Sequence, residues 1–356
     1  MFQPVVINTK KSVLIQPTNP LRNVVFLSLG DTPNEQGSTT TITQPINQSG
    51  YSDFIKKFSN SFFAFSQNTQ FAVYELKEYD NGTLQTTLGN LANQYGIMAM
   101  TDTLADQSGL QAILKALDIP NNPCLFLIGT TKSFTDNAIV TIAQSFSGLS
   151  NTLLCYESAT NNAIVGAISG LLASSKFSFN ANNPISPIVY TSLQGWKYST
   201  LTNETEQTAI ANNITYIKEL IKIPTLFNLT NMDGNQFLYW YSYKYTATMI
   251  KDGITQYMMN SANANRPLQY NQQGIDKLNS NIVGTLKLAQ SYGLINQFGI
   301  GDNNEFSATN IINSIPFATY ISNNPTNYAN GIYDGFSFSV QIGRYFKQIV
   351  LNITIF

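Results

Sequence analysis

Two carboxylates that follow predicted strands are the residues best placed to do chemistry. Asp31 comes directly after the apolar run 23–30, and Glu157 closes the apolar run 152–156. Active groups in α/β sheets gather at the carboxyl ends of the strands, so this pair is consistent with a metal-dependent hydrolase or phosphotransfer enzyme. The alternative interpretation is that both are ordinary loop carboxylates.

The absence of histidine narrows the chemistry that this chain can perform. With no histidine among 356 residues, there can be no Ser–His or Cys–His nucleophile pair and no histidine-ligated zinc or iron. Cys124 and Cys155 lie in apolar, strand-like runs, which predicts buried free thiols and neither a disulfide nor a metal pair. We therefore predict no enzymatic activity, no cofactor and no metal site.

Two other segments carry side chains that bind ligands in other proteins. Residues 299–305 offer oxygen ligands for a cation, but they lack the spacing of a calcium loop, so an ordinary polar turn is preferred. The aromatic run 237–245 could stack on sugars or bases, although its spacing favours core positions and contacts between subunits. Its rings are Tyr239, Trp240, Tyr241, Tyr243 and Tyr245.

The composition excludes several classes of partner. Charged residues make up 11% of the chain, and 19 basic against 20 acidic residues give a net charge of −1, so no basic field is present to bind nucleic acid. No apolar run reaches the length of a membrane span, and the first residues do not resemble a signal peptide. A surface with few charges suits dense assembly, although codon bias in an AT-rich genome would give the same composition.

The elements that must position these residues alternate between strands and helices in the first half. Continuous apolar strands separated by helices indicate an α/β fold with a mainly parallel, flavodoxin-like or Rossmann-like sheet, covered on both faces. No nucleotide-binding fingerprint is present. Residues 32–48 form a polar loop or a small exposed excursion. The predicted strands are 23–30, 70–77, 124–129, 152–157 and 187–193, and the predicted helices are 51–60, 84–95, 110–117, 133–146 and 161–174.

The second half predicts a helix pair followed by a β-rich segment. Ile210, Ile214, Ile217 and Ile221 would share one face of a helix over 204–221. Asp233-Gly234 is the expected turn of a hairpin between 226–230 and 237–241. Helices are then expected at 242–260 and 272–292, and strands with turns after Gly293, including 310–321.

Both ends of the chain contain strand-like apolar runs. An unpaired strand either folds back on its own sheet or pairs with another molecule, so these runs are candidate inter-subunit arms. The arm residues are Val5, Val6, Ile7, Val13, Ile15, Ile349, Leu351, Ile353 and Ile355. Lys10, Lys11, Arg344 and Lys347 either pair with acidic groups on adjacent subunits or are solvated charges that protect strand edges. An alternating run over 336–343 precedes the last apolar run.

Two stretches carry a resemblance to a known family. Residues 237–255 (FLYWYSYKYTATMIKDGIT) and 265–278 (NRPLQYNQQGIDKL) resemble the carboxyl-terminal domain of bacteriophage contractile-tail sheath proteins. In that family a hairpin leads to an aromatic- and Ile-rich helix, a loop, a second helix that opens near a glycine, and a closing β segment. The resemblance covers about 203–356 and is only architectural before residue 200.

The resemblance implies a structural subunit that forms hexameric rings stacked around a tail tube. Amino- and carboxyl-terminal arms would complete a sheet shared with neighbours, and the lattice would shorten on triggering while the arms keep it linked. The implied partners are further copies of the chain, the tube protein, the baseplate and the tail terminator, without nucleic acid or membrane insertion. The implied location is the virion tail, assembled in the host cytoplasm.

These expectations give a division of the chain. We expect an arm at 1–22, an α/β body at 23–200 with the excursion at 32–48, a carboxyl-terminal domain at 201–335, and a β segment with an arm at 336–356. Flexible roots for the arms are expected at 16–20 and 323–335. Alternatives to a sheath are another tail structural protein, such as a tube or baseplate component, and the enzyme that would use Asp31 and Glu157.

Overall fold

The structure is a computed structural model that describes residues 23–66, 70–76, 80–105, 109–118, 124–135, 137–174, 190–299 and 312–344. The strands are β1 (Val24–Ser28), β2 (Thr39–Ile42), β3 (Phe71–Glu75), β4 (Ile97–Thr101), β5 (Leu125–Thr130), β6 (Thr152–Tyr156), β7 (Ile214–Leu220), β8 (Ile223–Phe227), β9 (Ile295–Gly299), β10 (Asn313–Ser314), β11 (Phe336–Ser337) and β12 (Ser339–Ile342). The helices are α1 (Asp53–Phe65), α2 (Asn81–Ala92), α3 (Asp102–Ala105), α4 (Leu110–Ala116), α5 (Ala138–Ser145), α6 (Ile164–Ser174), α7 (Asn203–Ala211), α8 (Phe237–Asn263), α9 (Gln272–Ser291), α10 (Phe317–Asn323) and α11 (Pro325–Ala329).

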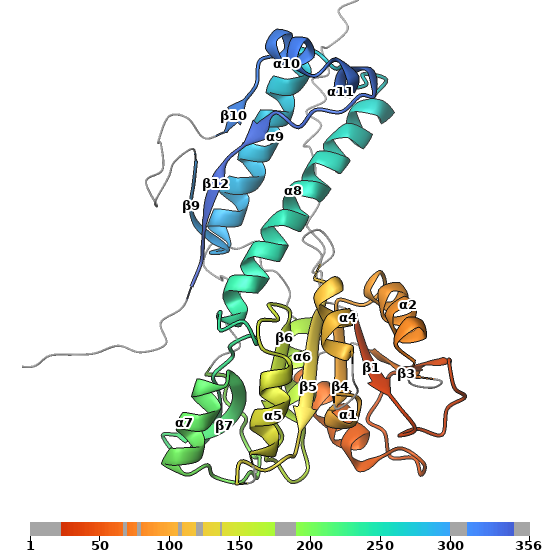
Figure 1. The fold of residues 1–356 in the computed structure, drawn as a ribbon, viewed down its shortest axis with the longest axis vertical. Coiled ribbons are helices and arrows are strands. Elements are labelled where there is room, and N and C mark those ends of the chain that lie inside the picture. Colours follow the sequence, from red (N-terminus) through yellow and green to blue (C-terminus); the bar gives the residue numbers. More distant parts are fainter. Residues whose placement is uncertain are drawn as a thin grey trace, which may run out of the picture.

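One eight-stranded sheet organises the lower part of the molecule in Figure 1, which we call the body (residues 23–236). Its order is β2-β3-β1-β4-β5-β6-β7-β8, and the strands from β3 to β7 run parallel to one another. The two edge strands, β2 and β8, are antiparallel to their neighbours. Because β3-β1-β4-β5-β6 follows the doubly wound order 2-1-3-4-5, the predicted flavodoxin-like, mainly parallel sheet is confirmed.

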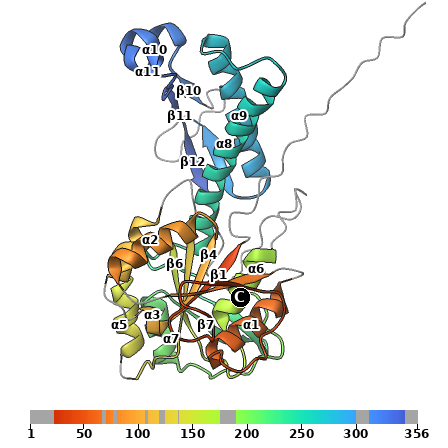
Figure 2. The same ribbon diagram turned by 90° about the vertical axis from the view of Figure 1, so that its right-hand side faces the viewer.

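Alternate residues of the central strands point into two separate cores. On one face Phe26, Ala99 and Leu127 pack with α1 and α6. On the other face Leu27, Met100 and Ile128 pack with α2, α4 and α5. Figures 1 and 2 show helices on both sides of the sheet. A sheet that is buried on both faces explains why its strands read as continuous apolar runs.

Glycine brings α1 and α6 unusually close together. Gly166 and Gly170 lie one helical turn apart on α6, facing α1. A methyl carbon on Gly170 would lie 2.5 Å from the carbonyl oxygen of Phe62, and one on Gly166 would overlap the carbonyl oxygen of Phe58. The backbones can therefore approach at this distance only because both positions lack a side chain.

A helical arm (residues 237–344) extends from the body. Helix α8 carries its buried residues between Phe237 and Met249 and then rises away from the sheet beside α9, which returns along it (Figure 1). The antiparallel pair β9–β12 lies against these helices, and its side chains Ile295 and Ile342 join the same core as α1 and α6. The arm therefore shares a core with one face of the body sheet.

The distal end of the helical arm is closed by α10, α11 and the short pair β10–β11. Tyr320 is fully buried there, and its hydroxyl donates a 2.6 Å hydrogen bond to the Oδ1 atom of Asp334. Tyr270 donates to the carbonyl of Ile332 at 2.6 Å. This ordered cap replaces the flexible root expected over 323–335, because Pro325 starts α11 and the Tyr320 network holds the residues that lead into β11.

The largest error of the sequence analysis is the helix predicted over 204–221. Helix α7 ends at Ala211, Asn213 takes a positive φ of 58°, and β7 begins at Ile214. The Asn228 side chain donates to the carbonyl oxygens of Ala209 (3.4 Å) and Ile214 (3.0 Å), bridging the end of α7 and the start of β7. The isoleucine spacing fits a helix because the buried part of β7 has apolar residues on both faces, so Ile214 and Ile217 are both buried.

Other elements also differ from the predictions. Residues 237–241 begin α8 and do not form a strand, so the hairpin is β7–β8, one connection earlier. Strand β4 was not predicted, part of the 32–48 excursion forms the edge strand β2, and 317–321 belong to α10. Most of the predicted strand 187–193 lies outside the described residues. None of the described helices is both long and apolar enough for a bilayer crossing.

Candidate functional site

The two-stranded ribbon β9–β12 is the strongest candidate for an assembly site. Its register joins Ser339 to Gly299 and Gln341 to Gln297, with an irregularity between Gln341 and Ile342. Within the described residues no third strand pairs with it. A two-stranded sheet is marginal by itself in water, and here one face is supported by α8 and α9. Among the described strands, β9 and β12 are each paired on one side only, with each other.

All of the predicted arm residues, and three of the four predicted inter-subunit charges, lie outside the described part of the chain. This applies to Val5, Val6, Ile7, Val13, Ile15, Ile349, Leu351, Ile353 and Ile355, and to Lys10, Lys11 and Lys347. The alternating run 336–343 is described, and it forms β11 and β12, which pair with β10 and β9 of the same chain. The segments that remain candidates for exchange between copies are therefore 1–22 and 345–356.

Arg344 is the one predicted inter-subunit charge that the structure describes. It is exposed, and its Cζ atom lies 4.4 Å from the ring centroid of Tyr239 on α8. An arginine over an aromatic face is attracted by the negative charge density of the ring. Arg344 is the last described residue, and this contact holds it against the first turn of α8.

The two edges of the large sheet, at β8 and β2, differ in how they are covered. Beyond β8, the backbone N–H groups of Tyr190 and Leu193 donate to the carbonyls of Leu226 (2.9 Å) and Pro224 (2.7 Å), so residues 190–193 cover this edge. Strand β2 is short and half exposed, and its residues are Thr39, Thr40, Thr41 and Ile42. The ribbon differs from both edges in being a separate two-stranded sheet that packs on two helices.

Glu157, one of the two candidate catalytic carboxylates, caps a helix. It is 8% exposed, and its Oε2 and Oε1 atoms accept hydrogen bonds from the N–H groups of Ile164 (2.6 Å) and Val165 (3.0 Å) at the start of α6. Burial raises the pKa of Glu157 to about 7, and these two bonds and Lys57 oppose the rise. These hydrogen bonds give Glu157 a structural role at the amino-terminal end of α6.

Asp31 lies at the same edge of the sheet but far from Glu157. Burial raises the pKa of Asp31, and repulsion from Glu75 adds to it. Glu75 accepts from the N–H of Gly30 and the hydroxyl of Thr32, both at 2.5 Å, and so fixes the turn after β1. Strands β1 and β6 are three strand spacings apart, about 14 Å at ~4.8 Å per step, which is too far for Asp31 and Glu157 to share one metal ion.

The other candidate ligand groups give no site in the described residues. No three Asp, Glu, Cys or His side chains in the described ranges could together hold a metal ion. Residues 300–305 lie outside the description, and both cysteines are buried free thiols, as predicted. Burial raises the pKa of both thiols far above the usual range, which makes them poor nucleophiles.

The aromatic run is mostly core. Trp240, Tyr241 and Tyr245 are buried, and the rings of Tyr241 and Tyr245 stack one helical turn apart, with centroids 5.9 Å from each other. Tyr243 is exposed, and the Lys244 ammonium lies 5.5 Å from its ring. Of the two interpretations of this run, the buried rings fit core positions and do not fit a platform that stacks on sugars or bases.

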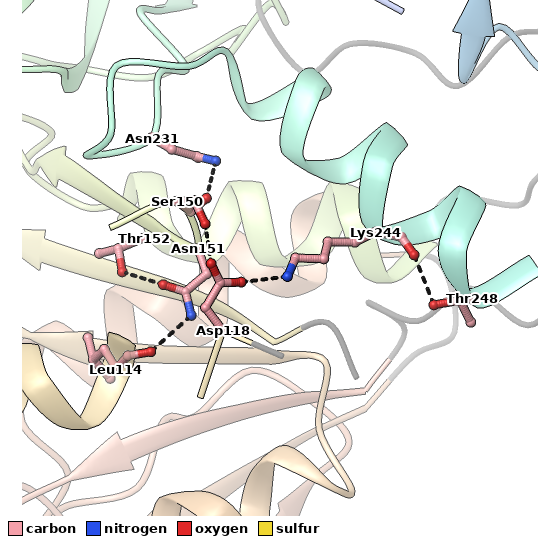
Figure 3. Close-up of polar contacts among 8 residues, drawn as sticks. All are labelled: Leu114, Asp118, Ser150, Asn151, Thr152, Asn231, Lys244 and Thr248. Atoms are coloured by element: carbon pink, nitrogen blue, oxygen red, sulfur yellow. Dashed lines mark hydrogen bonds and ion pairs between the residues drawn. The ribbon is translucent and has the colours of Figure 1, made fainter. Parts of the chain in front are cut away.

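The sequence analysis missed the polar contact at the base of the helical arm. The Nζ atom of Lys244 lies 2.6 Å from the Oδ1 atom of Asp118, and this lysine side chain is only 4% exposed (Figure 3). Ser150 donates its hydroxyl to the other oxygen of Asp118, and Asn231 donates to the Ser150 carbonyl at 2.5 Å. The sequence did offer one indication of this contact, because Lys244 is the single charged residue within the aromatic run 237–245.

Comparison with solved structures identifies this arrangement. A chain of the anti-feeding prophage (AFP) baseplate, 6-fold symmetrised, superposes with a TM-score of 0.65 at 12% identity over 95% of this chain and 94% of that one. The sheath tail protein Lin1278 from Listeria innocua gives a TM-score of 0.54 at 9% identity over 81% and 87% of the two chains. The chain has the fold of tail sheath proteins.

Two further comparisons complete this result. A chain of the AFP baseplate in its contracted state matches with a TM-score of 0.56 at 13% identity, over 100% of this chain and 99% of that chain. No family model and no curated protein matches the sequence. The sheath fold therefore emerges from structure, at identities too low for the likeness to show more than the fold.

Proposed function

We propose that this chain is a structural subunit of a contractile tail, forming the sheath around a tail tube. The observation that carries the proposal is the β9–β12 ribbon, a supported pair of strands that no third strand joins within the described residues. The likeness in fold to tail sheath and AFP baseplate chains supports it. The role is mechanical and needs no catalytic group.

Strand exchange is the proposed means of assembly. Segment 345–356 is 12 residues long and could span at most about 40 Å, and segment 1–22 about 75 Å. Each backbone hydrogen bond in an added strand contributes about 0.5–1.5 kcal/mol, so four or five bonds give a specific link between copies. In this proposal the arms of neighbouring copies complete the ribbon, and hexameric rings stack into a cylinder that shortens on triggering.

The proposed units follow from the pairing of the strands. They are an amino-terminal arm (1–22), the body, the helical arm and a carboxyl-terminal arm (345–356). This division moves the sequence-based boundaries at 200 and 335, because β7 and β8 continue the body sheet and β12 pairs with β9. The proposed partners are further copies, a tail tube, a baseplate and a tail terminator, in a virion-type tail assembled in the host cytoplasm.

Electron microscopy of the purified full-length chain tests the proposal. Long hollow cylinders are expected for the intact protein. A variant lacking 345–356 is expected to stay folded, with the same circular dichroism, but to form no cylinders. The deletion should not extend back to residue 336, because β11 and β12 pair with β10 and β9 and so belong to the helical arm. Cylinders of normal length from the truncated chain would contradict strand exchange through this arm.

A baseplate component is the second candidate function, because two of the similar chains come from AFP baseplate structures. A baseplate component would form single rings or closed discs and not extended cylinders. The same micrographs therefore separate the two candidates. If the full-length chain gives only rings under the conditions tested, including added tube protein, the baseplate role is favoured.

A further inference from the structure

Buried aromatic side chains at the base of α8 form much of the joint between the helical arm and the body. Phe237, Trp240, Tyr241 and Tyr245 are buried at the base of α8. Apolar packing of about the right volume specifies a unique arrangement less strictly than it specifies stability. A buried ion pair in this joint restricts the orientation of α8 further, because separating the two charges leaves them buried without partners.

Lys244 is the cation of this ion pair. It is the only charged residue in the stretch 237–249. Its side chain is almost fully buried, and its Nζ atom pairs with the Oδ1 atom of Asp118 at 2.6 Å. A buried ammonium without a partner is strongly unfavourable, so orientations of α8 that separate this pair are disfavoured.

Asp118 is itself held by the body. It follows the last turn of α4, where the helix dipole is negative, so a nearby cation is favourable for both the carboxylate and the helix end. The hydroxyl of Ser150 donates to the second oxygen of Asp118, and Asn151 donates to the Leu114 carbonyl at 3.2 Å. The acceptor of Lys244 is thus fixed by α4 and by the segment that leads into β6 (Figure 3).

The entry to α8 is fastened at the same place. The N–H of Met232 donates to the carbonyl of Thr152 at 3.0 Å, and the N–H of Gly148 donates to the carbonyl of Met232 at 2.9 Å. The Asn231 side chain reaches the Ser150 carbonyl. These bonds fix where α8 starts, and Lys244 lies two turns further along, paired with Asp118.

We propose that Lys244 is a positioning residue that sets the orientation of the helical arm on the body. Because α8 and α9 carry the β9–β12 ribbon, the pair also determines where the ribbon lies relative to the body sheet. In an assembly this position sets the geometry between neighbouring copies, a consequence that rests on the proposed sheath function. The orientation of the arm within one molecule does not rest on it.

The test is a distance measurement between two spin labels on the full chain. Labels at Gln85→Cys on α2 and Thr255→Cys on α8 report the angle between body and arm, since both positions are exposed. Labelled protein is diluted into unlabelled protein so that only distances within one molecule are seen. The starting chain should give one narrow distance, and Lys244→Met should broaden or shift it. Lys244→Arg, which keeps the charge, should restore it.

Two controls separate positioning from general stability. Lys251→Met removes an exposed lysine from the same helix and should leave the distance unchanged. Ile55→Val creates a small cavity in the body core, so it should lower the melting temperature without altering the distance. Should Lys244→Met fail to fold, the double variant Lys244→Met/Asp118→Asn leaves no unpaired buried charge and is the one to measure.

The outcomes are decisive in either direction. A broadened or shifted distance in a folded Lys244 variant, with both controls unchanged, supports the proposal. An unchanged narrow distance in Lys244→Met, or in the double variant, overturns it. Because the readout comes from single molecules, it stands whether or not the chain forms cylinders, so failure of the sheath proposal is recognised separately.

Discussion

The guanidinium of Arg344 lies over the ring of Tyr239, joining the end of the last described strand region to the first turn of α8. Strand β12 ends two residues earlier, at Ile342, and Gly343 donates its N–H to the carbonyl of Leu294 at 2.9 Å. These two contacts anchor the last described residues of the chain to the start of β9 and to α8.

Replacing Arg344 by alanine should loosen this anchor with little effect on the fold. A cation–π contact at an exposed site contributes about 0.5–1 kcal/mol, so we expect a loss of that size in the free energy of unfolding, measured with urea. Arg344→Lys should lose less, because it keeps a cation near the ring. Arg266→Ala removes an exposed arginine from the α8–α9 loop and serves as the control. An equal loss in Arg266→Ala would argue against the contact.

The pKa of Glu157 predicts how stability changes with pH. Burial raises it to about 7 from an ordinary value of 4.5. Below pH 4.5 the carboxyl is protonated in both states, so it has no effect on stability. Between these values the folded state holds a proton that the unfolded state has lost, and stability falls as pH rises. Above pH 7 the loss levels off at about 3 kcal/mol, at ~1.4 kcal/mol per pKa unit.

A Glu157→Gln variant tests this dependence. Its unfolding free energy should lack the decline between about pH 4.5 and 7 that the parent shows, so the difference between the two curves isolates Glu157 from the other carboxylates. The amide can accept only one of the two N–H bonds at the start of α6, so a pH-independent loss of about 1–2 kcal/mol is expected as well. Parallel curves across this range would show that Glu157 is not perturbed as described.

The close approach of α1 and α6 predicts a large effect of a small substitution. Gly166→Ala should lower the free energy of unfolding by about 1–3 kcal/mol, because its methyl group overlaps the backbone of Phe58 and the helices must separate. Gly284→Ala is the matched control, since that helical glycine on α9 has open space around it. The control should stabilise the protein by about 0.5–1 kcal/mol through helix propensity. Thermal unfolding of both variants checks the opposite signs.

The parallel sheet could be predicted from sequence because its strands leave a signal that no other element gives. Buried runs such as 124–129 and 152–156 are short, apolar and bounded by turn residues, and they became β5 and β6. The same signal failed at β7, where isoleucines at 214 and 217 fit helical spacing equally well. Only pairing with β6 and β8, a long-range contact, decides between the two.

The pairing of the candidate assembly site could be predicted only in part for a similar reason. The alternating run at 336–343 indicated a strand, but nothing local showed that its partner would be β9 of the same chain. Arg344 was singled out for its charge, while its contact with Tyr239 depends on how α8 lies against the ribbon. Lys244 was overlooked because its partner, Asp118, is distant in sequence and meets it only in the folded molecule.

The β7–β8 hairpin carries a turn whose residues suit its backbone poorly. Leu220 pairs with Ile223, so Ile221 and Lys222 form a two-residue turn, and both have positive φ, at 52° and 63°. This conformation costs about 1–2 kcal/mol for an ordinary L-residue, and Ile221 is 86% exposed, so burial does not offset it. Asn-Gly is the pair that such turns favour.

Substituting Ile221→Asn and Lys222→Gly should therefore stabilise the protein by about 1–2 kcal/mol, raising the melting temperature by a few degrees. As a control, Ile210→Asn replaces another exposed isoleucine, on α7, whose backbone is helical, and it should give no gain. If the double variant is no more stable than the parent, the hairpin does not hold this turn in solution. If it is more stable but assembles less readily, Ile221 contributes to a contact between copies that outweighs the strain in its turn.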